Sequence, residues 1–275
     1  MQRKKKKLIA LWLTLASLLL VLAGCGDDLA SQDVLTRVKA SNEISWGVKS
    51  DTRLFGLMSI KTGKVEGFDV DIATAVSKEI FGDQVQVNIV PVTSNTRMSL
   101  LKNGNVDALA STLTITPERK KEVLFSEVYF NAGQALMVKK GSQIKSVKDL
   151  TKGTKVIGLQ GSNSVENVKK AAPEAKILQL PDAAQAFAAL KSGQGDAMTS
   201  DNAILYGLAA DDSDYEIVGG TFTKEPYGLG INLGQEKFHQ AVDQALQTIE
   251  ADGTYAKIVK KWFGKIDGFD GGVVK

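Results

Sequence analysis

One eleven-residue stretch occurs twice in the chain: residues 101–111 read LKNGNVDALAS, and residues 190–200 read LKSGQGDAMTS. Six of the eleven positions are identical, namely Leu101/Leu190, Lys102/Lys191, Gly104/Gly193, Asp107/Asp196, Ala108/Ala197 and Ser111/Ser200. Each copy predicts a helix that ends at a glycine and then a short buried strand that ends in hydroxyl side chains. The spacing of nearly ninety residues is too long for a solenoid repeat. The repeat therefore predicts two similar α/β lobes, each presenting a strand end where open sheets bind ligands.

The same order of elements is predicted before both copies. In the first half the expected strands are 44–49 and 85–92, and the expected helices are 69–81 and 95–102. In the second half the expected strands are 155–160 and 176–180, and the expected helices are 164–171 and 183–191. Strands that alternate with helices of this length are typical of parallel βαβ units. The fold class is therefore α/β, with a βαβαβ order in each lobe.

Two segments connect the predicted lobes. Residues 130–140 are apolar and extended in character, and residues 219–234 cross back before two amphipathic helices over 236–250 and 255–263. Two lobes joined by two crossing strands form a hinge with a cleft between them. We expect one lobe to comprise residues 40–134 and 227–275, and the other to comprise residues 135–226.

The N-terminus has the pattern of an export signal. Five basic residues, Arg3 to Lys7, precede an uncharged run from Leu8 to Gly26, as in a signal peptide. The run is also just long enough to span a bilayer, so a retained anchor is the alternative. Within it, Leu22-Ala23-Gly24-Cys25 resembles the lipobox of bacterial lipoproteins. This resemblance implies removal of residues 1–24, lipidation of Cys25, a tether over residues 25–39, and a protein held on the outer face of the cell membrane.

Charge and motifs exclude several functional classes. Residues 1–24 hold five basic and no acidic residues, so without them the formal charge falls from +3 to −2, and the basic surface of a nucleic-acid-binding protein is missing. No phosphate-binding glycine loop and no Gly-x-Ser-x-Gly motif occurs in the sequence. Cys25 is the only cysteine and His239 the only histidine, which argues against a Cys/His zinc site and a Ser-His-Asp triad. We expect no catalytic residue, metal or cofactor.

Three groups remain as candidates for ligand binding. Arg119 follows Thr116 and Pro117, a cap and first position of a short helix, and its guanidinium can bind a carboxylate through two hydrogen bonds; alternatively it is one surface charge among Arg119–Lys121. The loop Gly161–Ser164 opens a helix, where free N–H groups bind anions, or its side chains simply cap that helix. Asp201 follows the second repeat, where it either receives an ammonium group or caps the next helix.

A broader resemblance rests on several motifs in order along residues 40–264. They are Gly67–Ala73, Thr114–Arg119, Phe125–Phe130, Gly161–Ser164, Asp201–Ala203 and Trp262–Gly264. Together they resemble the polar amino-acid family of bacterial ABC-transporter solute-binding proteins. The resemblance implies a periplasmic-binding-protein type II fold that closes on one free amino acid.

The resemblance also implies roles for individual residues. Contacts to the α-carboxylate of the ligand are implied for Arg119, the Thr114 amide, Ser162 and Ser164, and contacts to its α-ammonium for Asp201 and the Thr112 carbonyl. Asp51 lines the first-lobe side of the site and Phe55 supplies an apolar wall. The full candidate set is Lys49, Asp51, Arg53, Phe55, Arg97, Ser111, Thr112, Thr114, Arg119, Gln160, Ser162, Asn163, Ser164 and Asp201.

The loops 49–56 and 93–97 are expected to contact the ligand side chain. Their residues are similar to those of the glutamate, aspartate and glutamine branch of the family. Arg97 is either a ligand for a side-chain carboxylate or a solvated residue at a helix start. We expect glutamate first, aspartate next, and glutamine close behind.

The expected function is capture of a free amino acid by a monomeric lipoprotein, which delivers it to an ABC-transporter permease and its ATPase. An enzyme similar to a dehydratase of small carboxylic acids is the first alternative, and an amino-acid sensor on the same fold is the second.

Overall fold

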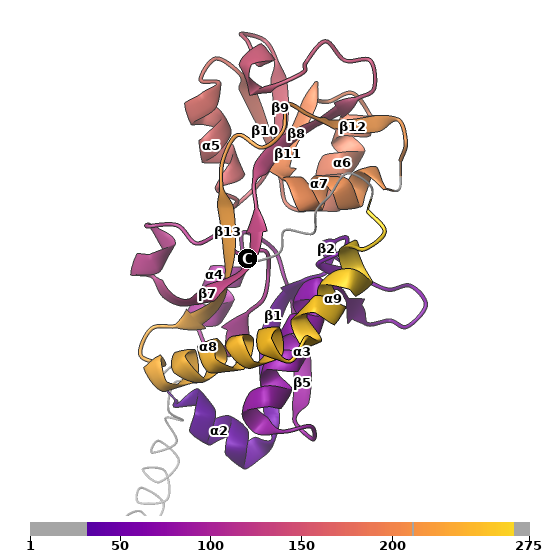
Figure 1. Ribbon diagram of the computed structural model, residues 1–275. Helices are drawn as coiled ribbons and strands as arrows, with labels where there is room; N and C mark the ends of the chain where they lie inside the picture. The colour runs from indigo at the N-terminus through magenta and orange to yellow at the C-terminus, as the bar shows by residue number, and fades with distance from the viewer. Residues whose placement is uncertain (1–31, 211, 267–275) are drawn as a thin grey trace, which may run out of the picture.

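The computed structural model describes residues 32–210 and 212–266, which form two lobes arranged end to end (Figure 1). Each lobe contains a five-stranded sheet, with the strand order β5-β1-β6-β13-β7 in the first and β10-β9-β11-β8-β12 in the second. The predicted signal peptide and residues 25–31 of the predicted tether, Cys25 among them, lie outside the described residues. The fold class is confirmed: the repeat predicted two α/β lobes, and the family resemblance implied the type II arrangement.

The first lobe contains the N-terminal and C-terminal parts of the described chain, as the indigo and yellow ends of the ribbon show (Figure 1). Its strands are β1 Glu43–Lys49, β5 Gln86–Val92, β6 Ala108–Leu109, β7 Val123–Ala132 and β13 Glu225–Asn232, with a separate antiparallel sheet of β2 Asp51–Thr52, β3 Gly56–Met58 and β4 Val65–Glu66. Its helices are α2 Val34–Ser41, α3 Phe68–Phe81, α4 Arg97–Lys102, the 3₁₀ turn η2 Arg119–Lys121, α8 Glu236–Ala251 and α9 Thr254–Phe263.

The second lobe repeats this plan with the middle of the chain. Its strands are β8 Gln134–Lys139, β9 Lys155–Leu159, β10 Lys176–Leu180, β11 Ala197–Asp201 and β12 Tyr215–Val218. Its helices are η3 Val147–Asp149, α5 Ser164–Ala171, α6 Ala183–Lys191 and α7 Asn202–Ala209. In both lobes the first strand of the βαβαβ unit lies between the other two and pairs with them in parallel.

The repeated sequence makes the same backbone contacts in both lobes. The Asp107 N–H donates to the Ser45 carbonyl, and its carboxylate accepts from the Ser45 N–H, both at 2.8 Å. Asp196 makes the same two bonds with Lys155, also at 2.8 Å. Each repeated aspartate thus ties the start of the third strand to the first. The repeated glycines end their helices with φ of 71° and 75°, left-handed values that glycine adopts without strain.

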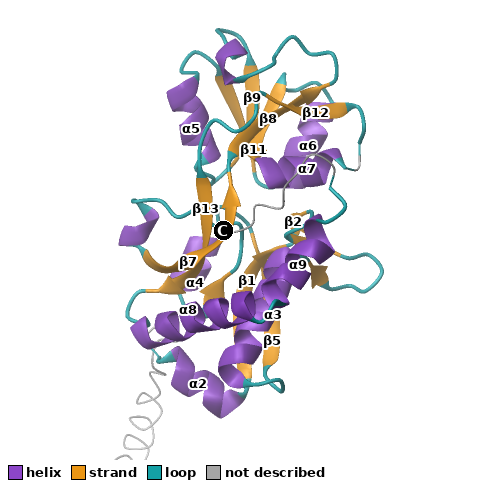
Figure 2. Ribbon diagram, viewed as in Figure 1, coloured by secondary structure: helices purple, strands orange, loops and turns teal. Residues whose placement is uncertain are grey.

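Apolar side chains at helical spacing decide which face of each helix is buried. In α8 they are Phe238, Val242, Ala245 and Ile249, and α8 packs with α3 and α9 beside the first sheet (Figure 2). The core of this lobe ends in an aromatic cluster of Phe55, Phe68, Phe130, Tyr227 and Phe263, whose neighbouring rings lie 5.1–5.9 Å apart. Such contacts add to the burial of apolar area.

The lobe boundaries differ from the expected ones by one or two residues. Gln134, expected in the first lobe, begins β8 of the second sheet, where it pairs with Asp201. Glu225 and Pro226, expected in the second lobe, pair with the end of β7 in the first sheet. The two crossings therefore lie at Gly133 and between β12 and β13, and the second crossing holds the first through a Phe222 N–H bond to the Gln134 carbonyl.

The predicted tether is wrong over residues 34–39, which belong to α2. Val34 and Val38, one turn apart, are buried against the first lobe, and burial of that face stabilises the short helix. Asp33 caps it by accepting from the Thr36 N–H at 2.8 Å. Within the described residues no helix is long and apolar enough to cross a bilayer.

Candidate functional site

Charged side chains gather where strands of both sheets end at the boundary between the lobes. Lys49 ends β1 and Asp201 ends β11, and Arg97 begins α4. Their exposed fractions are 3%, 5% and 2%. Charges are rarely this deeply buried unless opposite charges or a ligand compensate them.

Asp201 has one oxygen engaged and one without a partner. The Tyr227 hydroxyl donates to Asp201 Oδ2 at 2.6 Å, whereas Oδ1 is buried and finds no partner among the described residues. Burial, with a further contribution from Glu225, raises the pKa of the Asp201 carboxyl to about 6. Asp201 occupies the N-cap position of α7, as considered from the sequence, but its side chain makes no capping hydrogen bond.

Thr112 has an unusual backbone conformation, which hydrogen bonds from neighbouring side chains hold in place. Its φ is 47°, a left-handed value that costs free energy for a β-branched residue. Its N–H donates to Asp69 Oδ2 at 2.9 Å, and Tyr129 donates to Asp69 Oδ1 at 2.8 Å. Arg97 Nη1 donates to the Thr112 carbonyl at 3.2 Å and to the Ser111 carbonyl. Asp69 and Arg97 therefore hold the backbone of Ser111 and Thr112, and Tyr129 holds Asp69.

Arg97 and Lys49 are cations buried next to each other. Burial lowers the pKa of Arg97 to about 9, and burial followed by repulsion from Arg97 lowers the pKa of Lys49 to about 8. Asp51, Asp201 and Asp69 act on Lys49 in the opposite direction. The alternative that Arg97 is a solvated helix-start residue is thus wrong, because its side chain is buried and supports the loop after β6.

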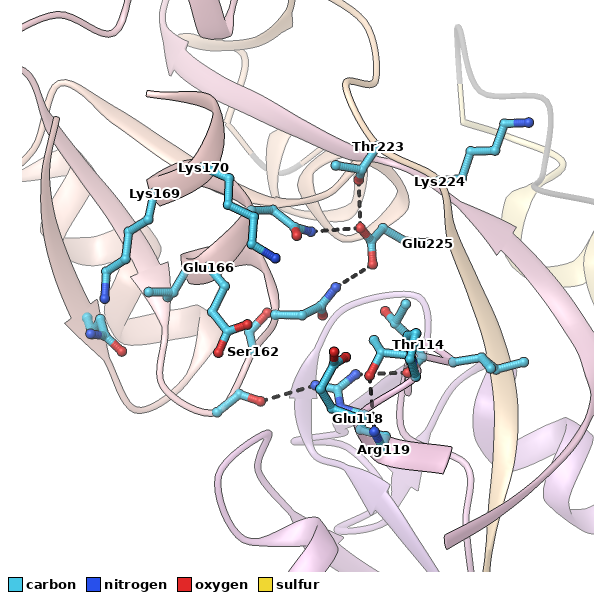
Figure 3. A pocket seen from close by; sticks show the side chains of 18 residues that line it. Thr114, Glu118, Arg119, Ser162, Glu166, Lys169, Lys170, Thr223, Lys224 and Glu225 are labelled. Carbon is cyan, nitrogen blue, oxygen red and sulfur yellow. Dashed lines mark hydrogen bonds between the residues drawn. The ribbon is translucent and has the colours of Figure 1, made fainter. Parts of the chain in front are cut away.

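Arg119 connects the two lobes. Its Nη1 donates to the Thr114 carbonyl at 2.9 Å, and its Nη2 donates across the boundary to the Gly161 carbonyl at 3.3 Å (Figure 3). Burial lowers the pKa of Arg119, and Asp201 and Glu225 oppose that shift. Thr116 caps the turn as predicted, accepting from the Arg119 N–H at 3.2 Å. The guanidinium is therefore an ordered group between the lobes rather than one charge in a solvated run.

The loop before α5 brings hydroxyl groups to the same place. Ser162 Oγ accepts from the Ser164 N–H at 3.1 Å, and the two hydroxyls are 2.9 Å apart. Asn163 does not cap α5 with its side chain; its Nδ2 donates to Glu225. Ser162 therefore caps α5 with its side chain, and Asn163 holds the loop to Glu225.

A cavity of about 750 Å³ opens beside this group. Figure 3 shows Thr114 and Arg119 on one wall, Ser162 and Glu166 on the other, and Glu225 at the back. Neither Asp201 nor Lys49 lines the cavity. Both residues are buried away from it.

Four buried polar atoms have no hydrogen-bond partner within the described part of the chain: Arg97 Nε, Ser111 Oγ, Thr112 Oγ1 and Asp201 Oδ1. Unsatisfied buried polar atoms are costly and rare in native proteins. Three of these lie in the first lobe and one in the second. They provide both donors and acceptors, so the arrangement suits a small ligand that carries both.

The remaining predicted residues are placed differently. Asp51 accepts from the Ala183 N–H of α6 at 2.8 Å, a contact between lobes. Phe55 is fully buried in the aromatic cluster, 5.8 Å from the Tyr227 ring, so it packs behind a residue that holds Asp201. Arg53 is half-buried, with its carbonyl close to Gly207. Gln160 is exposed, and its N–H bonds the Leu180 carbonyl.

Sequence reasoning missed several residues of the site, namely Asp69, Tyr129, Gln134, Glu225 and Tyr227. Tyr227 and Glu225 lie within residues 219–234, a segment that the sequence pattern indicated only as a connection between the lobes. Asp69 lies in the Gly67–Ala73 motif, where an acid just inside a helix start has an ordinary electrostatic explanation. A hydrogen bond between distant segments leaves no periodic signal. No cluster of metal-ligating side chains occurs in residues 32–210 and 212–266.

Residues 44–265 match the bacterial extracellular solute-binding proteins, family 3. The ABC transporter glutamine-binding protein GlnH of Bacillus subtilis is 47% identical over 265 residues, covering 94% of this chain and 97% of that protein. The glutamine-binding protein of Geobacillus stearothermophilus is 47% identical over 246 residues, covering 82% and 94%.

A solved structure supports the same assignment. An ancestral arginine-binding protein bound to glutamine superposes with a TM-score of 0.76 at 39% identity, covering 82% of this chain and 99% of that one. The family match extends over nearly all of the two lobes described above. The chain therefore belongs to family 3 of the bacterial extracellular solute-binding proteins.

Proposed function

We propose that the chain captures a free amino acid, glutamine first, by closure of its two lobes and delivers it to the permease of an ABC transporter. The observation that carries this proposal is the pair of opposite charges at the lobe boundary, Asp201 with a free buried oxygen and Arg119 between the lobes. A zwitterion complements such a pair. No neutral or singly charged group would satisfy both ends.

The α-ammonium is assigned to Asp201 Oδ1 and the Thr112 carbonyl, and the α-carboxylate to Arg119, the Thr114 N–H, Ser162 and Ser164. This assignment is supported by burial, because a charged hydrogen bond is strongest where water is excluded. The same assignment explains why ligand binding would favour closure of the two lobes. A ligand shifts the equilibrium toward the closed form only if it binds that form more tightly, and here each of its two ends would contact residues of both lobes.

The charge of the site favours a ligand with no net charge. The cations are Lys49, Arg97 and Arg119, and the carboxylates are Asp51, Asp69, Asp201 and Glu225. A glutamate ligand would add a further buried negative charge to a site that already holds more carboxyl groups than cations. The two relatives at 47% identity are glutamine-binding proteins, so we rank glutamine ahead of glutamate and aspartate, a change from the order expected from the sequence.

The test is a titration of the purified protein with glutamine, glutamate, aspartate, arginine and histidine by calorimetry, together with the shift in melting temperature. Bound ligand stabilises the folded form in proportion to its affinity. We expect glutamine to give the largest shift and a dissociation constant of about 1 μM, equivalent to about −8 kcal/mol. A larger shift with glutamate or arginine would reverse the preference, and no shift with any amino acid would refute the function.

We further propose that the protein works outside the cytoplasm as a monomer anchored through a lipid on Cys25, and that it catalyses no reaction. The Leu22–Cys25 sequence supports the anchor. The Cys25→Ser variant should be released from the membrane fraction, and the wild-type protein should stay in it. Incubation with glutamine and with small carboxylic acids should leave them unchanged by mass spectrometry; turnover would favour the dehydratase-like alternative.

A further inference from the structure

The carboxylate of Glu225 has three hydrogen-bond donors and almost no contact with solvent. Its exposed fraction is 2%. Oε1 accepts from Thr223 Oγ1 at 2.6 Å and from Asn167 Nδ2 at 2.9 Å, and Oε2 accepts from Asn163 Nδ2 (Figure 3). Asn163 and Asn167 belong to the start of α5 in the second lobe, whereas Glu225 begins β13 in the first sheet.

The other crossing strand joins the same network. Gln134, the first residue of β8, is fully buried. Its Nε2 donates to the Ser164 carbonyl at 2.8 Å, and its Oε1 accepts from Asn167 Nδ2 at 2.9 Å. Its N–H donates to Thr223 Oγ1 at 3.2 Å. Both crossings of the hinge are thus bonded to the first turn of α5, and Asn167 touches both.

This network surrounds the loop that the proposed function assigns to the ligand carboxylate. Ser162 and Ser164 flank Asn163, so an anchor on Asn163 fixes the position of both hydroxyl groups. The Gly161 carbonyl, next in the loop, accepts from Arg119. Rotation at the hinge would move Glu225 and the loop relative to each other, since they belong to different sheets.

We propose that Glu225 is a positioning residue: it holds the loop Gly161–Ser164 against the hinge in the closed arrangement, so that amino-acid binding and the hinge angle are coupled through α5. The proposal rests on the proposed function for the identity of the ligand. It requires no contact between Glu225 and the ligand side chain.

A carboxylate is suited to this place because it only accepts hydrogen bonds. All three of its neighbours offer N–H or O–H donors. The Glu225→Gln variant keeps the size of the side chain but turns one acceptor into a donor that faces another donor. A hydrogen bond to a charged group is also stronger than a neutral one.

The first test is calorimetry on Glu225→Gln, with Glu216→Gln, at a half-buried glutamate on β12 that pairs with Lys145 within the second lobe, as the matched control. We expect binding of the amino acids that bind the wild-type protein to weaken by about tenfold or more, by a similar factor for each, and the control to stay within about twofold. A changed ranking of amino acids would place Glu225 in contact with the ligand side chain and overturn the proposal. Unchanged affinity would also overturn it.

The pH profile separates positioning from a loss of packing. The groups that act on Asp201 are Glu225, Tyr227, Lys49 and Arg119. Removal of the Glu225 charge lowers the pKa of Asp201. The acid limit of binding, that is, the pH below which affinity declines, should therefore move to lower pH, while the maximum affinity falls. A variant that only loosened the fold would leave the acid limit where it is.

The last test needs no ligand and uses hydrogen exchange of the α5 amides. Glu225→Gln should speed their exchange by about tenfold, one donor-acceptor contact having been lost, while the α6 amides act as an internal control. Asn167→Ala, at a half-buried residue, should have the same direction of effect if Glu225→Gln fails to fold. Faster exchange with no bound amino acid in any assay would support the anchor and refute the proposed ligand. Unchanged exchange in both variants would refute the anchor.

Discussion

The Tyr227 hydroxyl donates to the Asp201 carboxylate at 2.6 Å, and this bond joins the lobes. Tyr227 lies in β13 of the first sheet, and Asp201 ends β11 of the second. The bond fixes one carboxylate oxygen and leaves Oδ1 buried without a partner in the described part of the chain. A carboxylate held in this way is oriented before any ammonium group reaches it, which reduces the entropy lost on binding.

Binding should weaken in acid because Asp201 must be ionised to receive an ammonium group. Its pKa is raised by burial to about 6, so the ionised fraction falls about tenfold per pH unit below that value. We expect affinity to decline below about pH 6, relative to its value at pH 7, as measured by calorimetry in overlapping buffers. Affinity that stays constant down to pH 4 would contradict this assignment.

Tyr227→Phe should shift the same profile to higher pH. The Tyr227 hydrogen bond lowers the pKa of Asp201, so its loss favours the protonated carboxyl. The acid limit of binding should therefore rise, opposite in direction to the shift expected for Glu225→Gln. Shifts of the same sign in both variants would indicate a general change of the site.

Arg119→Ala should remove most amino-acid binding without unfolding the protein. An unpaired buried carboxylate on the ligand costs about 3 kcal/mol, or more than about 100-fold in affinity. The side chain is half-buried, and its two bonds are to carbonyl oxygens, so the melting temperature without ligand should change by less than about 2 °C. Lys120→Ala, at the exposed neighbouring residue, is the control. Affinity close to wild type in Arg119→Ala would exclude Arg119 from the site.

Gly161→Ala should impair closure. A Cβ at Gly161 would lie 2.6 Å from the Ser94 carbonyl oxygen and 2.7 Å from Asn95 Cα, both backbone atoms of the other lobe. Gly193→Ala is a matched control, since Gly193 has a similar φ of 75° and nothing within 4 Å. Both variants should lose about 1 kcal/mol of stability in urea, and only Gly161→Ala should bind amino acids at least about tenfold more weakly. Equal affinities would show that the lobes close without this contact.

Asp51→Ala should lower affinity for every amino acid by a similar factor. The Asp51 carboxylate accepts from the first N–H of α6 across the lobe boundary, an interaction worth about 1 kcal/mol, or about fivefold. Because the bond stabilises the closed form, its loss should not depend on the ligand side chain. A changed ranking of amino acids in the calorimetric panel would instead assign Asp51 to the side-chain subsite.

Much of the fold could be predicted because its signals are local. The spans of α5, β10 and α6 agree with the expected ones residue for residue, since apolar spacing and capping residues lie within each element. The sheet of β2, β3 and β4 was missed, because its strands have only two or three residues. The helix α2 was missed because only two of its residues are buried.

The residues of the candidate site likewise fall into those that local sequence signals could indicate and those that they could not. Arg119, Ser162, Ser164 and Asp201 could be proposed because each follows a strand or opens a helix, where open sheets bind ligands. Tyr227 and Glu225 could not be proposed, because their partners lie 26 and 62 residues away in sequence. Those contacts exist only once the second crossing strand has paired with β7.

The sequence by itself determined the two α/β lobes, the order of strands and helices, and the family, because periodicity and local motifs depend only on residues that are close together in the sequence. Only the tertiary structure decided which charges are buried together, which oxygen of Asp201 is free, and which residues connect the hinge to α5. Burial and hydrogen bonding between distant segments depend on the closed packing of both lobes, and that packing is a property of the whole chain.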